Sequence, residues 1–121
     1  LQDNVFLYGS CTDTFAILNQ ATVGVLCSTY EGFPVTLLEY GYARLAVLST
    51  NVGFCSTIIE DGKNGLLFSP DNETEIVSKL NLLIQNSENI ISTFAENLHT
   101  AVVENYTDTA VIKSYIQFLR K

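Results

Sequence analysis

The sequence contains no methionine and no tryptophan, and its charge is one-sided, with six Lys and Arg against thirteen Asp and Glu. The net charge of −7 comes without any run of basic residues. Binding to nucleic acid or to an anionic membrane surface depends on clustered cations, so we exclude both as direct partners. No stretch approaches the roughly twenty consecutive apolar residues that span a bilayer, and no signal-peptide pattern opens the chain.

Cysteine is also scarce, and its spacing excludes two further classes of protein. Cys11, Cys27 and Cys55 are widely separated and form no CxxC pair. This favours reduced thiols in a cytoplasmic protein over a disulfide framework, and it gives no support to a zinc site that would include His99. We therefore expect no metal. Because even position 1 is not methionine, we also expect that Leu1 lies inside a longer protein.

What is present is a chain of 121 residues that is 47% hydrophobic with a mean hydropathy of +0.23, which is typical of one packed domain, residues 1–121. Short apolar runs alternate with helical segments in the first half. Such alternation favours an α/β fold with a Rossmann-like parallel sheet of about four strands and flanking helices. The predicted strands are Val5–Tyr8, Val23–Cys27, Leu45–Ser49 and Leu66–Phe68.

The second half of the chain is predicted to be helical. Asn72 with Glu75 three residues later is typical of a capping box, and Asp108 can cap the last helix. Between and after them, apolar residues recur at helical spacing, which predicts three amphipathic helices with core-facing stripes. His99 lies near one of these stripes, and we interpret it as a helix residue without chemistry.

The segment with most potential for chemistry connects the strand Val23–Cys27 to a helix that starts at Pro34 and ends near Arg44. The first backbone N–H groups of a helix have no internal partner and lie at the positive end of the helix dipole. Gly32 allows a ligand to approach the backbone closely. The amides of Val35 and Thr36 are then free for an anion, of which a diphosphate is the best fit. The alternative is an ordinary junction between a strand and a helix.

Two carboxylates flank this junction. Glu31 lies in the loop before the helix, and Glu39 lies within a helix that is apolar nearly all round. A buried Glu39 would need hydrogen-bond donors, and sugar hydroxyls are suitable ones. The alternative, which the spacing leaves equally open, is that Glu39 points to water along a narrow exposed strip.

Glu31 and Glu39 form an E-x7-E pattern. Together with the surrounding Ser28-x-x-Glu31-Gly32-Phe33-Pro34, it resembles the signature of retaining glycosyltransferases of family 4, with the GT-B fold. Three further segments resemble that family in the same order along the chain. They are Val5–Gly9, then Val52-Gly53 followed by Ile58–Phe68, and finally Tyr106-Thr107-Asp108. This resemblance implies the C-terminal nucleotide-sugar-binding domain of such an enzyme.

The resemblance also implies roles for the residues of the junction. The residue matching Glu31 meets hydroxyls of the transferred sugar and is the catalytic-site carboxylate, and the residue matching Glu39 binds the ribose. Backbone amides around Gly32, Phe33, Pro34, Val35 and Thr36 hold the diphosphate. The implied reaction moves a hexose-type sugar from a nucleoside diphosphate to a saccharide or lipid-linked acceptor with retention, without a cofactor or metal. Polysaccharide biosynthesis in the cytoplasm, at the inner face of the membrane, is the implied setting.

Some positions depart from the family pattern. Arg44 stands where the family has a glycine, Ala46 where it has a proline, Phe54 where it has a second glycine, and Thr57 where it has a glutamate. A degenerate, non-catalytic scaffold or partner subunit is therefore an alternative, in which Arg44, Phe54 and Thr57 close the pocket.

The family's upstream Arg-x4-Lys pair and its acceptor-binding domain have no counterpart in this sequence. Because the cations of that pair neutralise the diphosphate, we expect weak donor binding by this chain alone. We also expect it to be inactive without a partner, the N-terminal GT-B half.

Overall fold

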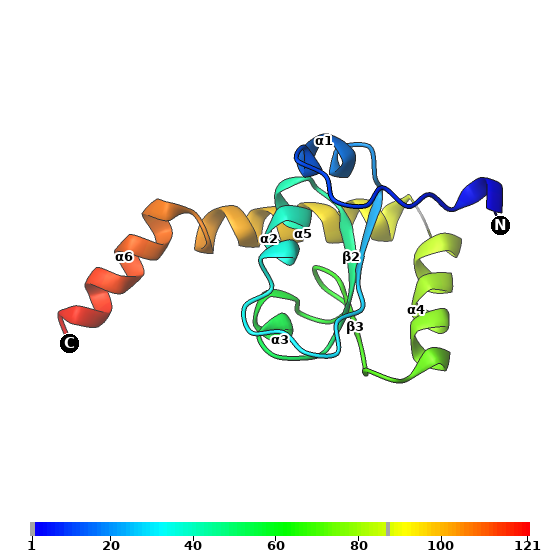
Figure 1. The fold of residues 1–121 in the computed structure, drawn as a ribbon. Helices are drawn as coiled ribbons and strands as arrows, with labels where there is room; N and C mark the ends of the chain where they lie inside the picture. Colours follow the sequence, from blue (N-terminus) through cyan, green and yellow to red (C-terminus); the bar gives the residue numbers. More distant parts are fainter. Residues whose placement is uncertain (1, 87) are drawn as a thin grey trace.

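A computed structural model describes residues 2–86 and 88–121. Its centre is a parallel sheet of three strands in the order β1-β2-β3, namely β1 (Val23–Leu26), β2 (Ala46–Thr50) and β3 (Leu66–Phe68) (Figure 1). Val23 of β1 lies opposite Ala46, and Leu48 of β2 lies opposite Leu66. All three carboxyl ends therefore meet at one edge of the sheet.

Helices connect and follow the strands, as parallel neighbours require. The short α1 (Thr14–Leu18) precedes β1, α2 (Val35–Tyr42) joins β1 to β2, and α3 (Cys55–Ile58) joins β2 to β3. The chain then continues through α4 (Glu73–Gln85), α5 (Asn89–Asn105) and α6 (Asp108–Leu119), and a 3-10 turn (Gln2–Asn4) opens it. The predicted α/β class with a helical C-terminal half is confirmed.

Both faces of β2 are covered, because every residue of this strand is buried. Val47 packs on one face with residues of α2, α3 and α5, whereas Leu48 packs on the other with α4 and the start of α5. This alternation is what period-two side chains of a central strand require. His99 is a residue of helix α5, as expected, and its Nδ1 lies 3.1 Å from the Gly41 carbonyl oxygen of α2.

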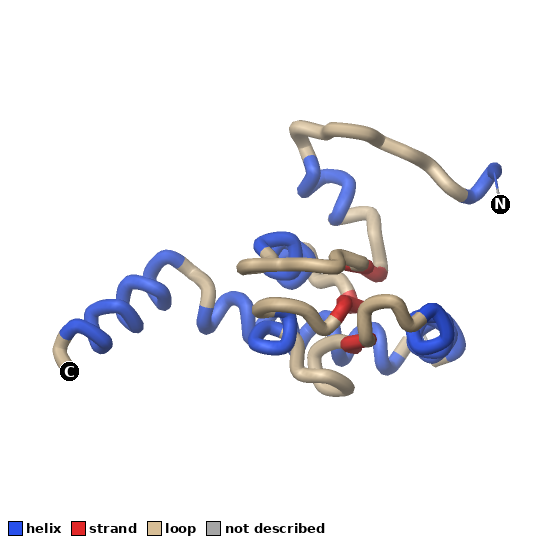
Figure 2. Tube along the Cα trace, turned by 60° about the horizontal axis from the view of Figure 1, so that its bottom comes forward, coloured by secondary structure: helices blue, strands red, loops and turns tan. Residues whose placement is uncertain are grey.

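The prediction of a buried strand at Val5–Tyr8 was wrong. These residues form no strand, and their side chains are 60–97% exposed. Figure 2 shows the segment running apart from the three strands. A strand is stabilised by a hydrogen-bonded neighbour, and none of the described residues pairs with Val5–Tyr8 or with the outer edge of β1. The sheet thus has three strands instead of about four.

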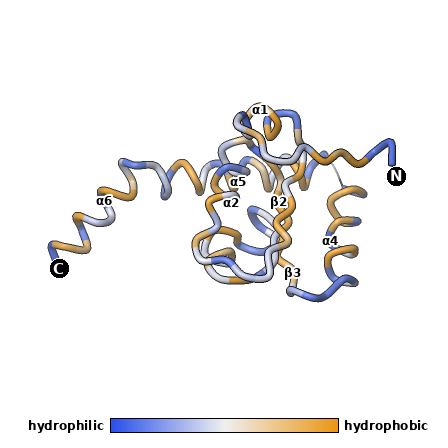
Figure 3. The backbone as a smooth tube through the Cα atoms, in the orientation of Figure 1, coloured by the Kyte–Doolittle hydropathy of each residue, from blue (hydrophilic) through white to orange (hydrophobic). Residues whose placement is uncertain are grey.

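The last helix also differs from its prediction. Its N-terminal cap is Thr107, whose Oγ1 accepts the Ala110 N–H at 3.2 Å, and not Asp108. None of its residues is buried, and α6 projects away from the core with its apolar turns outside it (Figures 1 and 3). The residues expected to face the core, Val111, Tyr115, Ile116 and Leu119, are exposed instead. With Ile112 and Phe118 they form the exposed stripe of α6.

At the start of α4 the predicted capping box is only half formed. Asn72 Oδ1 accepts the Glu75 N–H at 3.0 Å, but Glu75 does not return to the Asn72 amide. Its carboxylate instead accepts the Ser69 N–H at 2.8 Å, while the Asn72 N–H donates to the Ser69 carbonyl.

Within residues 2–86 and 88–121, no helix has the length and apolar character that a membrane crossing requires.

Candidate functional site

Glu31 is held in place by a short chain of hydrogen bonds at the carboxyl end of the sheet. Thr50 Oγ1, at the end of β2, donates to the Ser28 carbonyl oxygen at 2.7 Å. The Ser28 hydroxyl in turn donates to Glu31 Oε1 at 2.5 Å, and Glu31 is half-buried. The carboxylate is therefore oriented by β1 and β2 together and still reaches solvent. The sequence motif contains Ser28, but the support from Thr50 depends on the register of the two strands.

The loop after β2 packs closely against the loop that carries Glu31. Gly53 has a φ of +52°, and a Cβ at this position would lie 1.8 Å from the Glu31 carbonyl oxygen. Next to it, the Phe54 N–H donates to the Gly32 carbonyl at 3.3 Å. Only glycine satisfies both the backbone angle and the contact, so Gly53 fixes how the two loops meet.

The N-terminus of α2 is less open than its sequence predicts. Pro34 is buried and precedes the helix with φ −81° and ψ 84°, close to the inverse γ-turn geometry. In this turn the Val35 N–H donates to the Phe33 carbonyl at 3.0 Å, so the prediction of a free Val35 amide was wrong. The Thr36 N–H, by contrast, has no hydrogen-bond partner within the described residues. Thr36 is half-buried, which leaves its amide as the unpaired donor at this helix end.

Glu39 is exposed, which decides between the two alternatives left open by its spacing. It lies four residues after the exposed Val35, so both belong to the same face of α2. At 1.5 Å of rise per residue, its Cα lies about 6 Å along the axis from the first helical residue. The carboxylate is thus in solvent, on the helix face that begins at the junction.

Three aromatic rings from separate loops meet beside Glu31. The Phe33 ring centroid lies 6.0 Å from that of Phe54 and 5.9 Å from that of Tyr106, with interplanar angles of 49° and 54°. Tyr106, which follows α5, packs against the core cluster. No local sequence pattern predicts this cluster, because its members are 21 and 52 residues apart along the chain.

The family departures lie in different places. Arg44 lies beyond the far end of α2, adopts a left-handed φ of 57°, and pairs with Glu96. This backbone angle explains why the family has glycine there. Thr57 is exposed and lines a cavity with Tyr106, and Ala46 is buried in β2. Phe54 alone among these residues contacts the Glu31 loop, so Arg44 does not close the junction as the scaffold hypothesis supposed.

Tyr40 holds α2 against the sheet. Tyr40 follows Glu39, packs its ring on Gly24 of β1, and approaches the Val25 carbonyl oxygen at 3.4 Å. Burial, followed by the nearby charge of Glu39, raises the pKa of the Tyr40 hydroxyl above 10.0. The phenol is therefore neutral near pH 7 and acts as an anchor.

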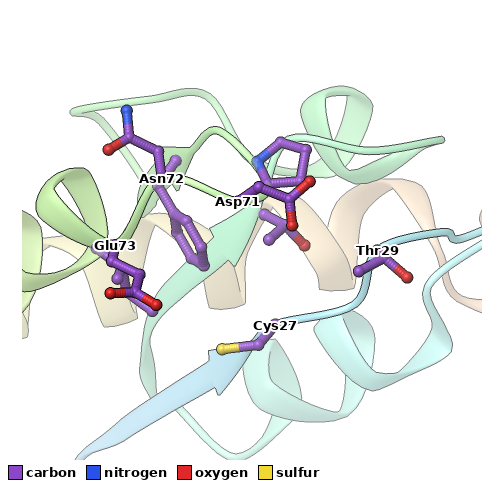
Figure 4. A pocket seen from close by; sticks show the side chains of 9 residues that line it. Cys27, Thr29, Asp71, Asn72 and Glu73 are labelled. Atoms are coloured by element: carbon purple, nitrogen blue, oxygen red, sulfur yellow. The ribbon is translucent and has the colours of Figure 1, made fainter.

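A separate cavity of about 170 Å³ lies at the same sheet edge, on the α4 side (Figure 4). Cys27, Thr29, Asp71, Asn72 and Glu73 are among its lining residues, and Figure 4 shows their side chains around it. It has two carboxylates and no Lys, Arg or His in its lining, which disfavours a phosphate. The first turn of α2 contains no acidic residue, whereas that of α4 contains Glu73 and Glu75, so the start of α2 is the better anion site.

The family model described as "Glycosyl transferases group 1" matches residues 1–109. The chain belongs to this family. Among curated relatives of this glycosyltransferase domain is the poly(ribitol-phosphate) alpha-N-acetylglucosaminyltransferase of Staphylococcus aureus. It is 26% identical over 96% of this chain and 24% of that protein. A Campylobacter jejuni alpha-1,4-N-acetyl-D-galactosaminyltransferase acting on a diphospho-undecaprenol-linked saccharide is 31% identical over 74% of this chain and 25% of that protein.

Solved structures agree with this assignment. The C-terminal domain of the group 1 glycosyltransferase LpcC from Francisella tularensis matches 86% of this chain and 53% of that one, with a TM-score of 0.75 and 27% identity. A Staphylococcus aureus TarM variant in complex with UDP and alpha-GlcNAc-glycerol matches all of this chain and 24% of that one, with a TM-score of 0.85 and 25% identity. The glycosyltransferase domain thus has the fold of a GT-B C-terminal domain and spans about a quarter of the curated relatives' length.

Proposed function

We propose that this chain is the part of a retaining glycosyltransferase that binds the nucleoside-diphosphate sugar, at the junction of β1 and α2. The observation that carries the proposal is the unpaired Thr36 N–H at the start of α2, five residues after the oriented carboxylate of Glu31 in the same junction. An unpaired amide at the positive end of a helix suits a diphosphate oxygen. Glu31, oriented by Ser28, suits the hydroxyls of the sugar attached to it.

Glu39 is the third contact, with the ribose hydroxyls. Its exposed carboxylate lies on the helix face that starts at the junction, within reach of a ligand that extends from the helix end along α2. In this arrangement the sugar lies at Glu31, the diphosphate at Thr36 and the nucleoside along α2. The Val35 amide takes part when the ligand replaces its γ-turn bond to Phe33.

Transfer breaks the bond between the anomeric carbon and the diphosphate oxygen, and the electron pair leaves with that oxygen. A new bond forms to an acceptor hydroxyl on the same face of the sugar, and the hydroxyl proton is lost to the leaving diphosphate. The backbone N–H dipole of Thr36 stabilises the growing negative charge on the diphosphate. The Glu31 carboxylate orients the sugar.

The sugar and its acceptor are inferred from the relatives. Both relatives named above transfer an N-acetylhexosamine with alpha configuration, and the solved TarM complex contains UDP. We therefore propose UDP-N-acetylhexosamine as the donor and a saccharide or lipid-linked polymer as the acceptor. This places the reaction in the assembly of surface polysaccharides.

A second protein segment completes the enzyme in this proposal, as the N-terminal half does in the GT-B fold. The described residues around the junction include no Lys or Arg in contact with Glu31 or Thr36, so the diphosphate charge needs cations from elsewhere. The exposed stripe of α6 and the outer edge of β1 are apolar or unpaired surfaces on which this half can pack. The chain alone is then inactive and binds its donor weakly.

The test is a titration of the chain with UDP followed by amide NMR. We expect the Thr36 N–H resonance to shift with millimolar affinity, whereas the Glu75 N–H, which Asn72 already caps, stays in place. Glu39→Ala should abolish the shift, and Glu88→Ala, which removes an exposed carboxylate at the start of α5, should not. An unmoved Thr36 resonance at about 10 mM UDP, which corresponds to less than about 3 kcal/mol of binding, would contradict the proposal.

A further inference from the structure

Phe33 and Phe54 together form an exposed apolar surface beside Glu31, which we call the aromatic ledge. The two rings are 46% and 53% exposed, although each belongs to a loop that is otherwise held by backbone contacts. The Tyr106 ring contacts Phe33 and is itself packed against the core. The ledge is therefore held by a ring that is anchored to the core, while its own two rings remain about half exposed.

The position of the ledge depends on the same contacts that fix Glu31. Gly53 touches the Glu31 carbonyl, and the Phe54 N–H donates to the Gly32 carbonyl, so Phe54 cannot move independently of the Glu31 loop. Phe54 is a large apolar side chain that stays 53% exposed, at a position where the family pattern has glycine. Exposed apolar surface beside oriented polar groups is characteristic of a ligand site.

The chemistry of a sugar matches this combination. A pyranose presents hydroxyls around its edge and C–H groups on its faces, and an N-acetylhexosamine adds an apolar methyl. The Glu31 carboxylate accepts hydrogen bonds from the hydroxyl edge, whereas aromatic rings contact C–H groups. The diphosphate has no use for a phenyl ring, so the ledge and the Thr36 amide serve different parts of one donor.

We propose that the aromatic ledge packs against the C–H face of the transferred sugar, and that Phe54 sets the preference for a sugar nucleotide over the bare nucleotide. This inference rests on the proposed function, since it places the sugar at Glu31. It assigns Phe54 a role in specificity, in contrast to the hypothesis that this residue closes the pocket.

The test compares two ligands on one set of variants. UDP and UDP-N-acetylglucosamine are titrated into the chain and into Phe54→Ala, with affinity measured by NMR. An aromatic contact of this kind corresponds to about 3- to 10-fold in affinity. We therefore expect Phe54→Ala to lose that much affinity for the sugar nucleotide and none for UDP. Phe54→Tyr should retain it, and Phe15→Ala, which removes an equally exposed ring in α1, should change neither ligand.

The outcomes separate the two proposals. If the unmodified chain binds neither ligand, the proposed function fails and the ledge fails with it. If UDP binds but Phe54→Ala weakens both ligands equally, or neither, the ledge is rejected while the nucleotide site stands. A ledge that is instead covered by another protein segment would leave sugar affinity unchanged in Phe54→Ala and lower the affinity for that segment. Thermal unfolding of each variant verifies that it is folded.

Discussion

Helices α2 and α4 both start shortly after a parallel strand ends, yet their first turns are completed in opposite ways. At α4, the Asn72 side chain accepts the Glu75 N–H, and Glu73 and Glu75 place negative charge in the first turn. At α2, Pro34 offers no side-chain cap, and the first turn contains no acidic residue. The chain therefore gives the start of α4 a side-chain cap and negative charge of its own, whereas the start of α2 has neither and is the better place for an anion.

The same contrast holds for what surrounds each terminus. Asp71 and Glu73 line the cavity near the start of α4, so that end of the sheet repels a phosphate. Around α2 the one nearby carboxylate with a defined partner, Glu31, is turned toward the Ser28 hydroxyl. Since both junctions lie at the carboxyl edge of one sheet, the fold alone does not choose the site. The choice comes from capping and charge.

Among the variants that distinguish the α2 junction from the α4 junction, we expect the largest effect from Gly53→Ala, which displaces the Glu31 loop and leaves α4 untouched. The added Cβ meets the Glu31 carbonyl and the backbone stays left-handed, so we expect the free energy of unfolding to fall by about 2 kcal/mol. We also expect UDP binding to be lost. Urea unfolding and titration measure the two effects.

Gly9→Ala is the matched control for this variant. Gly9 also has a positive φ, of 66°, but a Cβ there meets no atom within 4 Å, so it reports backbone strain without the contact. Equal losses of stability in the two variants would contradict the account of how the loops meet.

An intermediate effect is expected from Asn72→Ala, which makes α4 resemble α2. Removing a side-chain cap costs about 1 kcal/mol, and we expect that loss in urea unfolding. UDP affinity should not change, because the cap belongs to the start of α4 and not to the proposed UDP site at the start of α2. A change in UDP affinity as large as the change in stability would show that the two helix ends are not independent.

Local patterns predicted most elements of this fold, because their burial follows from the chain itself. The strand Ala46–Thr50 is buried on both faces and overlaps the apolar run Leu45–Leu48, and the start of α2 is marked by Pro34. Val5–Tyr8 has an equally strong apolar pattern and forms no strand, because strand formation depends on a neighbour that its own residues cannot provide.

The candidate site divides in the same way. The prediction that Glu31 lies in a loop just before a helix is confirmed, since loop and helix start are encoded within twelve consecutive residues, whereas its role stays a prediction. The turn that occupies the Val35 amide depends on one ψ angle of Pro34, which no sequence pattern specifies. The ledge needs Phe54 and Tyr106 to arrive from distant loops, so tertiary packing alone creates it.

The smallest effect, and the one most specific to the start of α4, concerns the pH dependence of stability. The Ser69 N–H, and then Lys79, lower the pKa of the Glu75 carboxyl below 4.5. A lowered folded pKa gives stability that is fully present above 4.5 and is lost as the pH falls through the folded value. Glu75→Gln should therefore be less stable than the original chain at pH 7 and lose less stability on acidification from pH 5 to pH 3.

Glu73→Gln, in the same turn but without a hydrogen bond to the carboxylate among the described residues, should follow the original chain in urea unfolding at each pH. Parallel curves for Glu75→Gln and the original chain would mean that the Ser69 contact contributes nothing, and that α4 is closed by Asn72 alone.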